Sequence, residues 1–133
     1  MDYDTFVNLV ARRAGVDVDR AVELSRAALE TLNDRLPGGA ALDLATQLPL
    51  PLQGLLRPPD DAAESFDAAE FVRRVATRAE TGEEAARDAA RALFHALREA
   101  VEGAEFDDLV ARLPADYGTL VEPAPAPGAP QRR

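Results

Sequence analysis

His95 is the single histidine of this chain, and it stands in a stretch rich in alanine and charged residues. A histidine, with an ordinary pKa of about 6.5, can act as a general base or as a metal ligand. Either role needs partners, and neither a serine nucleophile nor a second nitrogen or sulfur ligand stands near His95 in the sequence. We therefore interpret His95 as a solvent-facing or boundary residue of a helix, and we predict no catalytic residue.

Three acidic pairs are candidates for a divalent-cation site: Asp60-Asp61, Glu83-Glu84 and Asp107-Asp108. Calcium and magnesium sites need several oxygen atoms that converge from a shaped loop, and the sequence has no acidic, glycine-containing loop of that kind. Helix starts attract acidic residues through the helix dipole, which accounts for the second and third pairs. We predict no metal ligand and no cofactor-binding residue.

Gly38-Gly39 and two arginine pairs, Arg12-Arg13 and Arg73-Arg74, are the groups that most resemble a phosphate site. The glycine pair lacks the Lys and the Ser or Thr of a phosphate-binding loop, and it follows a helical stretch rather than a strand. The net charge of −9 at pH 7 repels polyanions. We interpret the glycines as a turn and the arginines as cover for a helix surface, and a nucleic-acid partner is disfavoured.

Composition limits the class of protein. The chain has 133 residues, of which 47% are hydrophobic, and it contains no Cys and no Trp. This length suits one domain, and a core of Leu, Val and Ala is typical of helix bundles. Without cysteine there is no disulfide and no thiolate zinc site. No stretch approaches the roughly 18 apolar residues of a membrane span and no signal peptide opens the chain, so we expect a cytoplasmic protein.

An internal repeat organises the sequence. Residues 2–55 align with residues 67–120 without gaps, and 17 of the 54 positions are identical. We therefore predict an all-α fold, a helical bundle of two tandem pseudo-equivalent halves, each with three helices and a short terminal helical turn. The predicted organisation is a single domain over 1–121, repeats at 2–56 and 67–121, a linker at 57–66, and a disordered Pro/Ala-rich tail at 122–133.

Capping signals and apolar spacing place the helix ends. Residues that cap helix starts are expected at Asp2, at Asp17, at Asp67 with Glu70 as a capping box, and at Thr81 with Glu84. Phe66 and Phe71 are spaced as a hydrophobic staple, and Gly15 suits a left-handed helix end. A turn at Pro37-Gly38-Gly39 is expected before a third helix over 40–48.

Three polar positions recur in the repeat: Arg13 and Arg78, Arg26 and Arg91, Asp43 and Asp108. We predict that an arginine of the first or second helix bonds the aspartate of the third helix in each half, since an arginine fork suits a carboxylate. Chance recurrence is the alternative, because both residue types are common in this chain.

Four short strings carry a resemblance to a known family. They are Asp-Tyr-Asp-x-Phe at 2–6, Val-Ala-Arg-Arg-Ala-Gly at 10–15, Ala-Leu-Glu-Thr-Leu-Asn-Asp-Arg-Leu at 28–36 and Asp-Leu-Ala-Thr-Gln-Leu-Pro at 43–49. Over both repeats, the sequence resembles the bacterial and archaeal domain of unknown function 2267 family (DUF2267). The resemblance implies an all-helical fold and supplies no catalytic residue.

The function expected from these observations is non-enzymatic. The first hypothesis is a helical interaction or regulatory module that acts on a protein partner, or on a second copy, through a groove or a helix face. The alternative is a small-molecule-binding or sensing protein with an apolar pocket between the halves. A large apolar cavity would favour the alternative, and a flat exposed patch of Leu or Phe would favour a protein partner. A polar cleft that gathers His95 with carboxylates would favour an enzyme.

Overall fold

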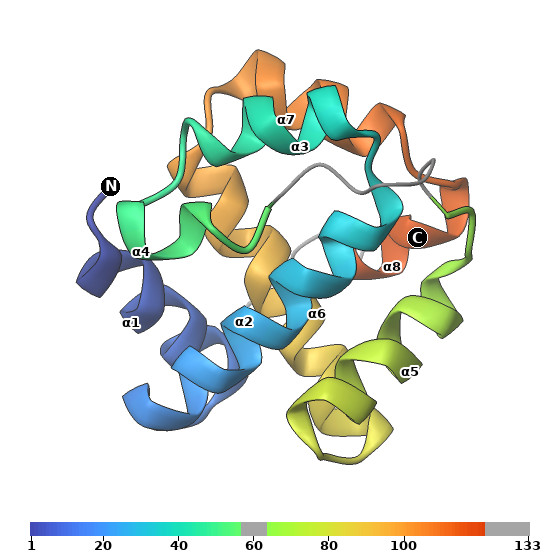
Figure 1. Cartoon of the computed structure of the whole chain (residues 1–133). Helices are drawn as coiled ribbons and strands as arrows, with labels where there is room; N and C mark the ends of the chain where they lie inside the picture. The colour runs from blue at the N-terminus through green and yellow to red at the C-terminus, as the bar shows by residue number, and fades with distance from the viewer. Residues whose placement is uncertain (57–63, 122–133) are drawn as a thin grey trace, which may run out of the picture.

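The computed structural model describes residues 1–56 and 64–121, and every regular element in these two ranges is a helix (Figure 1). The predicted all-α fold is therefore confirmed. In chain order the elements are α1 (Tyr3–Ala14), α2 (Val18–Arg35), α3 (Gly38–Ala45), α4 (Leu50–Gln53), α5 (Ala68–Ala79), α6 (Glu83–Ala100), α7 (Gly103–Ala111), the 3-10 turn η1 (Ala115–Tyr117) and α8 (Gly118–Val121). Most of the predicted linker, residues 57–63, and the whole predicted tail, residues 122–133, lie outside the described residues.

Helix bounds repeat along the chain with the offset found in the sequence. α5 begins 65 residues after α1, at Ala68 against Tyr3, and both helices have 12 residues. α6 begins 65 residues after α2, and both have 18 residues. The short elements that follow Leu48-Pro49 and Leu113-Pro114 also begin 65 residues apart, at Leu50 and Ala115. The helix order therefore occurs twice, and the two long helices of each repeat also have matching lengths.

The four long helices pack across the repeat. α1 lies against α6 and α2, α5 lies against α2 and α6, and α2 also contacts α6. The most extensive of these contacts joins α1 to α6, so the first helix of the chain packs on a helix of the second repeat. α3 and α7 lie side by side over one end of these helices (Figure 1). The helices of the two repeats are thus interlocked rather than arranged as two separate bundles.

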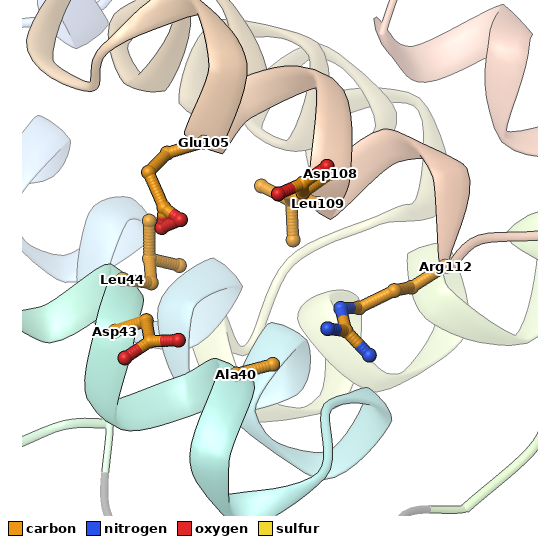
Figure 2. A pocket seen from close by; sticks show the side chains of 7 residues that line it. All are labelled: Ala40, Asp43, Leu44, Glu105, Asp108, Leu109 and Arg112. Atoms are coloured by element: carbon orange, nitrogen blue, oxygen red, sulfur yellow. The ribbon is translucent and has the colours of Figure 1, made fainter.

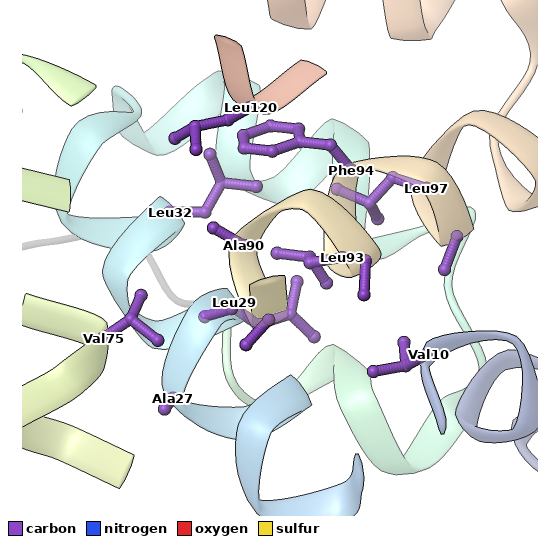
Figure 3. Packing of buried hydrophobic residues seen from close by; sticks show 14 of the residues in the cluster. Val10, Ala27, Leu29, Leu32, Val75, Ala90, Leu93, Phe94, Leu97 and Leu120 are labelled. Carbon is purple, nitrogen blue, oxygen red and sulfur yellow. The ribbon is translucent and has the colours of Figure 1, made fainter. Parts of the chain in front are cut away.

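The core consists of apolar stripes on the helices. Phe6, Val10, Phe71 and Val75 form the stripes of α1 and α5, and all four are completely buried. Leucine and alanine side chains of α2 and α6 fill the centre (Figure 3): Ala27, Leu29, Leu32, Ala90, Leu93 and Leu97. The Phe71 ring lies 5.7 Å from the ring of Tyr117 in an edge-on arrangement. Burial of these side chains is the main stabilising contribution to the fold.

Local signals set most of the helix ends. The carboxylates of three predicted caps each accept a hydrogen bond from the backbone N–H three residues later, at 2.8 to 2.9 Å: Asp2, Asp17 and Asp67. Gly15 ends α1 with a φ of 73°, the left-handed conformation that glycine adopts without strain. The Phe66 and Phe71 rings lie 6.4 Å apart, so the predicted staple is also confirmed.

The start of α6 differs from the prediction. Gly82 is the N-cap residue and provides no side-chain hydrogen bond, so the predicted cap at Thr81 with Glu84 is wrong. Gly82 stands 65 residues after Asp17, which means that the repeat keeps the position of the cap but not its side chain. Glu83 and Glu84 in the first turn of α6 compensate in part, because their charges interact favourably with the helix dipole.

The reversal between α2 and α3 also differs from the prediction. Leu36 and Pro37 make the turn with extended backbone, at ψ values of 141° and 157°. α3 then begins at Gly38 and ends at Ala45, whereas the sequence predicted a helix over 40–48. Among the described residues, the positive φ angles belong to Gly15 and Glu80. Two extended residues are enough to reverse the chain, so the glycines are free to form the first turn of α3.

Candidate interaction surface

His95 lies on α6 at the boundary of the core, where the sequence predicted it. Burial lowers the pKa of His95, and the positive charges of Arg13 on α1 and of Arg98 lower it further, while Glu99 opposes them. Within the described residues, no side chain forms a hydrogen bond to the imidazole. A general base is normally oriented by a second group, and the described part of the chain supplies none to His95.

The acidic pairs do not converge. Glu83 and Glu84 are exposed at the start of α6, and Asp107 and Asp108 are exposed on α7. Across residues 1–56 and 64–121, no three His, Cys, Asp or Glu side chains are gathered so that they could hold a metal ion. The remaining pair, Asp60-Asp61, lies outside the described residues.

The predicted bonds from the recurring arginines to Asp43 and Asp108 are not formed. Both aspartates are exposed, and neither makes an ion pair with an arginine of the described residues. Instead they line a cavity of about 50 Å³ between α3 and α7, together with Glu105 and Arg112 (Figure 2). The prediction is wrong because α3 and α7 lie beside each other, and their aspartates face the opposite short helix rather than α1 or α2.

The recurring arginines have other surroundings. Arg13 of α1 lies close enough to His95 of α6 to affect its pKa, and Arg78 of α5 bonds side chains of α2. Arg13 and Arg78 occupy equivalent positions in the two repeats. Each therefore faces the second helix of the other repeat, which is α6 for Arg13 and α2 for Arg78. Arg26 lines a groove beside Arg78, and Arg91 is partly exposed on α6. Nothing in the structure explains why this second arginine recurs.

An ionic cluster joins α2 to α5. We call it the Arg74 cluster, and it consists of Asp34, Glu64, Glu70, Arg74 and Arg78. Arg74 bonds Glu64 and Glu70 at 2.9 Å each and Asp34 at 3.3 Å, and Arg78 bonds Asp34 at 2.8 Å. Glu70 therefore binds arginine instead of completing the capping box predicted for α5. Hydrogen bonds from Arg74 hold the pKa of Glu64 and of Glu70 below its ordinary value.

The chain that enters α5 is held by the same arginine. The guanidinium carbon of Arg74 lies 4.0 Å from the centre of the Phe66 ring, a cation–π contact. The carbonyl oxygen of Phe66 accepts hydrogen bonds from Arg35 Nε at 3.2 Å and from the Tyr117 hydroxyl at 2.9 Å. Burial raises the pKa of Tyr117 to about 12, so this hydroxyl remains a donor at neutral pH.

Two charged grooves follow the line between α2 and α5, and together we call them the α2–α5 surface. The first groove, of about 500 Å³, is lined by the charged residues Arg20, Glu23, Arg26, Glu30, Arg78 and Glu80. The second, of about 530 Å³, adjoins the Arg74 cluster, and Arg78 lines both grooves. Three side chains of the first groove form no ion pair or side-chain hydrogen bond within the described residues: Arg26, Glu30 and Glu80.

Sequence reasoning missed this surface. The central Arg74 does not recur, because its counterpart is Leu9, and the counterpart of Asp34 is Glu99. One signal was present, since Glu70 precedes two arginines by three and four residues, a spacing that predicts ion pairs on one helix. The bonds to α2 depend on how α5 packs across the repeat, and no local pattern reports that packing.

These features define a class of protein: an all-helical domain in which two similar sets of helices interlock and expose a charged surface between α2 and α5. The family described as Uncharacterized conserved protein (DUF2267) matches residues 3–120, and the chain belongs to this family. The resemblance seen in the sequence is thereby confirmed. None of the curated proteins matches the chain. Among the described residues, no helix combines the length and the apolar character needed to cross a membrane.

Proposed function

We propose that this chain is a non-enzymatic helical interaction or regulatory module that binds a protein partner through the α2–α5 surface. The observation that carries the proposal is the set of charged side chains without a partner in the first groove: Arg26, Glu30 and Glu80. Paired charges such as the Arg74 cluster are engaged within the fold. Unpaired charges of both signs on one surface can meet opposite charges on another protein, which favours specific association.

A small-molecule-binding or sensing function is the second candidate, and the surface supports it less well. Ligand pockets are commonly about 300 to 1,000 Å³ and are lined mainly by apolar and aromatic side chains. The two grooves of the α2–α5 surface reach that size, but their linings are dominated by arginine and acidic residues. The cavity between α3 and α7 is only about 50 Å³.

An apolar mode of docking would use other residues. Leu50 of α4 and Leu42 of α3 are large apolar side chains that are 78% and 49% exposed. They lie on different helices from the charged grooves, so substitutions separate the two modes. The cytoplasmic location expected from the sequence is part of the same proposal, and fractionation of host cells tests it.

Capture of partners by the intact chain from its host, followed by binding measurements with a purified partner, tests the charged surface. We expect Arg26→Glu to weaken binding about tenfold or more, as expected when like charges meet in an interface. Arg87→Glu makes the same charge change at an exposed position of α6 and should change affinity less than about twofold. Binding that survives Arg26→Glu but is lost in Leu50→Ser would move the site to α4 and contradict the proposal.

A further inference from the structure

The contacts between residues 1–56 and residues 64–121 are reciprocal. α1 of the first segment packs on α6 of the second, and α5 of the second segment packs on α2 of the first. α5 is the repeat counterpart of α1, and α2 is that of α6. The same pair of helix surfaces is therefore in contact twice, once as α1 with α6 and once as their repeat counterparts α5 with α2. An interface of this kind is isologous, and it implies a twofold axis.

The short helices indicate where this axis passes. The cavity between α3 and α7 is lined by three positions of α3 and by the same three positions of α7 (Figure 2): Ala40 and Glu105, Asp43 and Asp108, Leu44 and Leu109. The members of each pair stand 65 residues apart, which is the offset of the repeat. A position that faces its own counterpart lies at or beside a twofold axis. This geometry is that of a dimer interface, although it lies within one chain.

The first segment depends on the second for its long-range hydrogen bonds. Within residues 1–56, the hydrogen bonds join residues at most five positions apart. Bonds that cross to the second segment include Arg74 and Arg78 with Asp34, at 3.3 and 2.8 Å. At the other end of the interface, Glu102 N–H donates to Gln47 Oε1 at 2.8 Å. The long-range hydrogen bonds of the first segment are therefore made to the second segment.

We infer that the partner this interface fits is a second copy of the chain, with residues 1–56 of one copy closing on residues 64–121 of another. In such a segment-exchanged dimer, each first segment packs on the second segment of the other copy, which gives two folded units. Each unit has the same contacts as the monomer, and only the connection between the segments differs. Within one chain, a short connection gives the segments an effective concentration in the millimolar range. The monomer is therefore the main form in dilute solution. The segment-exchanged dimer forms when the first segment of a chain cannot pack on the second segment of the same chain.

Complementation between two full-length variants tests the inference. Leu32 and Leu97 are repeat counterparts, and both are completely buried. Leu32→Asp disables the first segment and Leu97→Asp disables the second, because a buried carboxylate without a partner is strongly unfavourable. We expect neither variant alone to melt cooperatively. After joint refolding, the intact segments of the two variants should form a mixed dimer with a cooperative melt and half the wild-type helical signal per chain. Leu42→Asp, at an exposed position, is the control and should remain a folded monomer.

Deletion of residues 57–63 provides a second test on an otherwise unchanged chain. α4 packs on α1, whereas α5 packs on α2 and α6, and the deletion would force Leu56 and Glu64 to be neighbours with Cα atoms about 3.8 Å apart. We expect light scattering to show a helical dimer rather than a monomer. A deletion variant that remains a monomer with the wild-type melting temperature would overturn the inference. A mixture of the two leucine variants that melts no more cooperatively than its components would also overturn it, whether or not the deletion variant folds.

Discussion

The α2–α5 and α1–α6 contacts join counterpart helices, but their chemistry differs. Across α2–α5, Arg74 and Arg78 meet Asp34, and Arg78 also donates to Thr31. The counterpart positions across α1–α6 hold Leu9, Arg13, Glu99 and Ala96. Leu9 packs against the core and Ala96 is completely buried, so that contact is largely apolar. One arrangement of helices can thus be closed either by apolar burial or by an ionic cluster.

The difference between the two contacts has a geometric result. The α1–α6 contact is the more extensive of the two, and the charged grooves lie along α2–α5. An alanine allows two helix backbones to approach closely, whereas an arginine–carboxylate pair needs room for both side chains. The presence of arginine and threonine in place of leucine and alanine therefore accompanies a more open surface along α2–α5.

Arg74→Leu should have the largest effect on stability. It places in the α2–α5 contact the residue type that Leu9 provides at the equivalent position of the α1–α6 contact. The substitution removes the arginine that Asp34, Glu64 and Glu70 share and should lower the free energy of unfolding by about 2 kcal/mol, since these pairs are partly exposed and Asp34 and Glu70 each keep a second arginine. A loss of that size corresponds to a fall in melting temperature of about 7 °C. Arg73→Leu on the same helix is the control, because Arg73 bonds only Glu70 and is 55% exposed, and its effect should stay below about 1 kcal/mol. Equal effects in thermal melts would show that the Arg74 cluster acts like an ordinary surface ion pair.

Acidification should weaken the α2–α5 contact selectively. The pKa of Glu64 and of Glu70 is lowered in the folded protein from an ordinary value of 4.5. The unfolded chain therefore takes up these protons first, so the stabilisation is complete above pH 4.5 and is lost as the pH falls through the folded-state values. We expect the difference in melting temperature between wild type and Arg74→Leu to shrink from about pH 6 to about pH 3. A constant difference over this range would contradict the assignment of the stabilisation to these carboxylates.

The ends of α1 and α5 offer a matched pair of substitutions with smaller effects. Gly15 and Glu80 are counterparts, and both adopt left-handed backbone, with φ values of 73° and 55°. Glu80→Gly should raise the free energy of unfolding by about 0.5 to 1 kcal/mol, because glycine adopts this conformation without steric strain. Gly15→Ala should lower it by about 1 kcal/mol through backbone strain alone, since a Cβ at Gly15 meets nothing within 4 Å. Chemical denaturation that shows the same sign for both variants would refute this explanation.

Ser25→Ala should produce the smallest change, an increase of about 0.5 kcal/mol in the free energy of unfolding. The Ser25 hydroxyl is buried without a hydrogen-bond partner in the described structure, and its repeat counterpart is the buried Ala90. Thr31→Ala is the contrasting variant, because the Thr31 hydroxyl donates to a backbone carbonyl and accepts from Arg78. Thr31→Ala should therefore destabilise the protein in the same denaturation experiment, and a stabilising effect would contradict the hydrogen bonds assigned to it.

What the sequence predicted correctly is mostly local. The caps Asp2, Asp17 and Asp67 act within one helical turn, so each can be recognised without knowledge of the rest of the fold. The apolar stripes were also predictable, because helix period alone determines which face is buried. The local Thr81-x-x-Glu84 pattern predicts a cap at Thr81, whereas the repeat places the cap at Gly82, where the structure has it.

The candidate surface was not predictable in the same way. Arg74 and Asp34 are 40 positions apart, and they meet only because α5 packs on α2. The predicted partner of the recurring arginines, Asp43, faces α7 for the same reason. A sequence repeat indicates which positions are equivalent, but it does not state whether equivalent helices pack within their own repeat or across to the other.

Tyr117 makes the fold sensitive to alkaline conditions and gives it an optical reporter. Its hydroxyl donates to the Phe66 carbonyl, and burial raises its pKa from 10.0 to about 12. The unfolded chain releases this proton at lower pH, so the stabilisation from the buried phenol is complete below pH 10 and is lost between pH 10 and about 12. The chain has two tyrosines and no tryptophan. Ultraviolet absorbance of tyrosinate in an alkaline titration would therefore report the pH at which η1 separates from the start of α5.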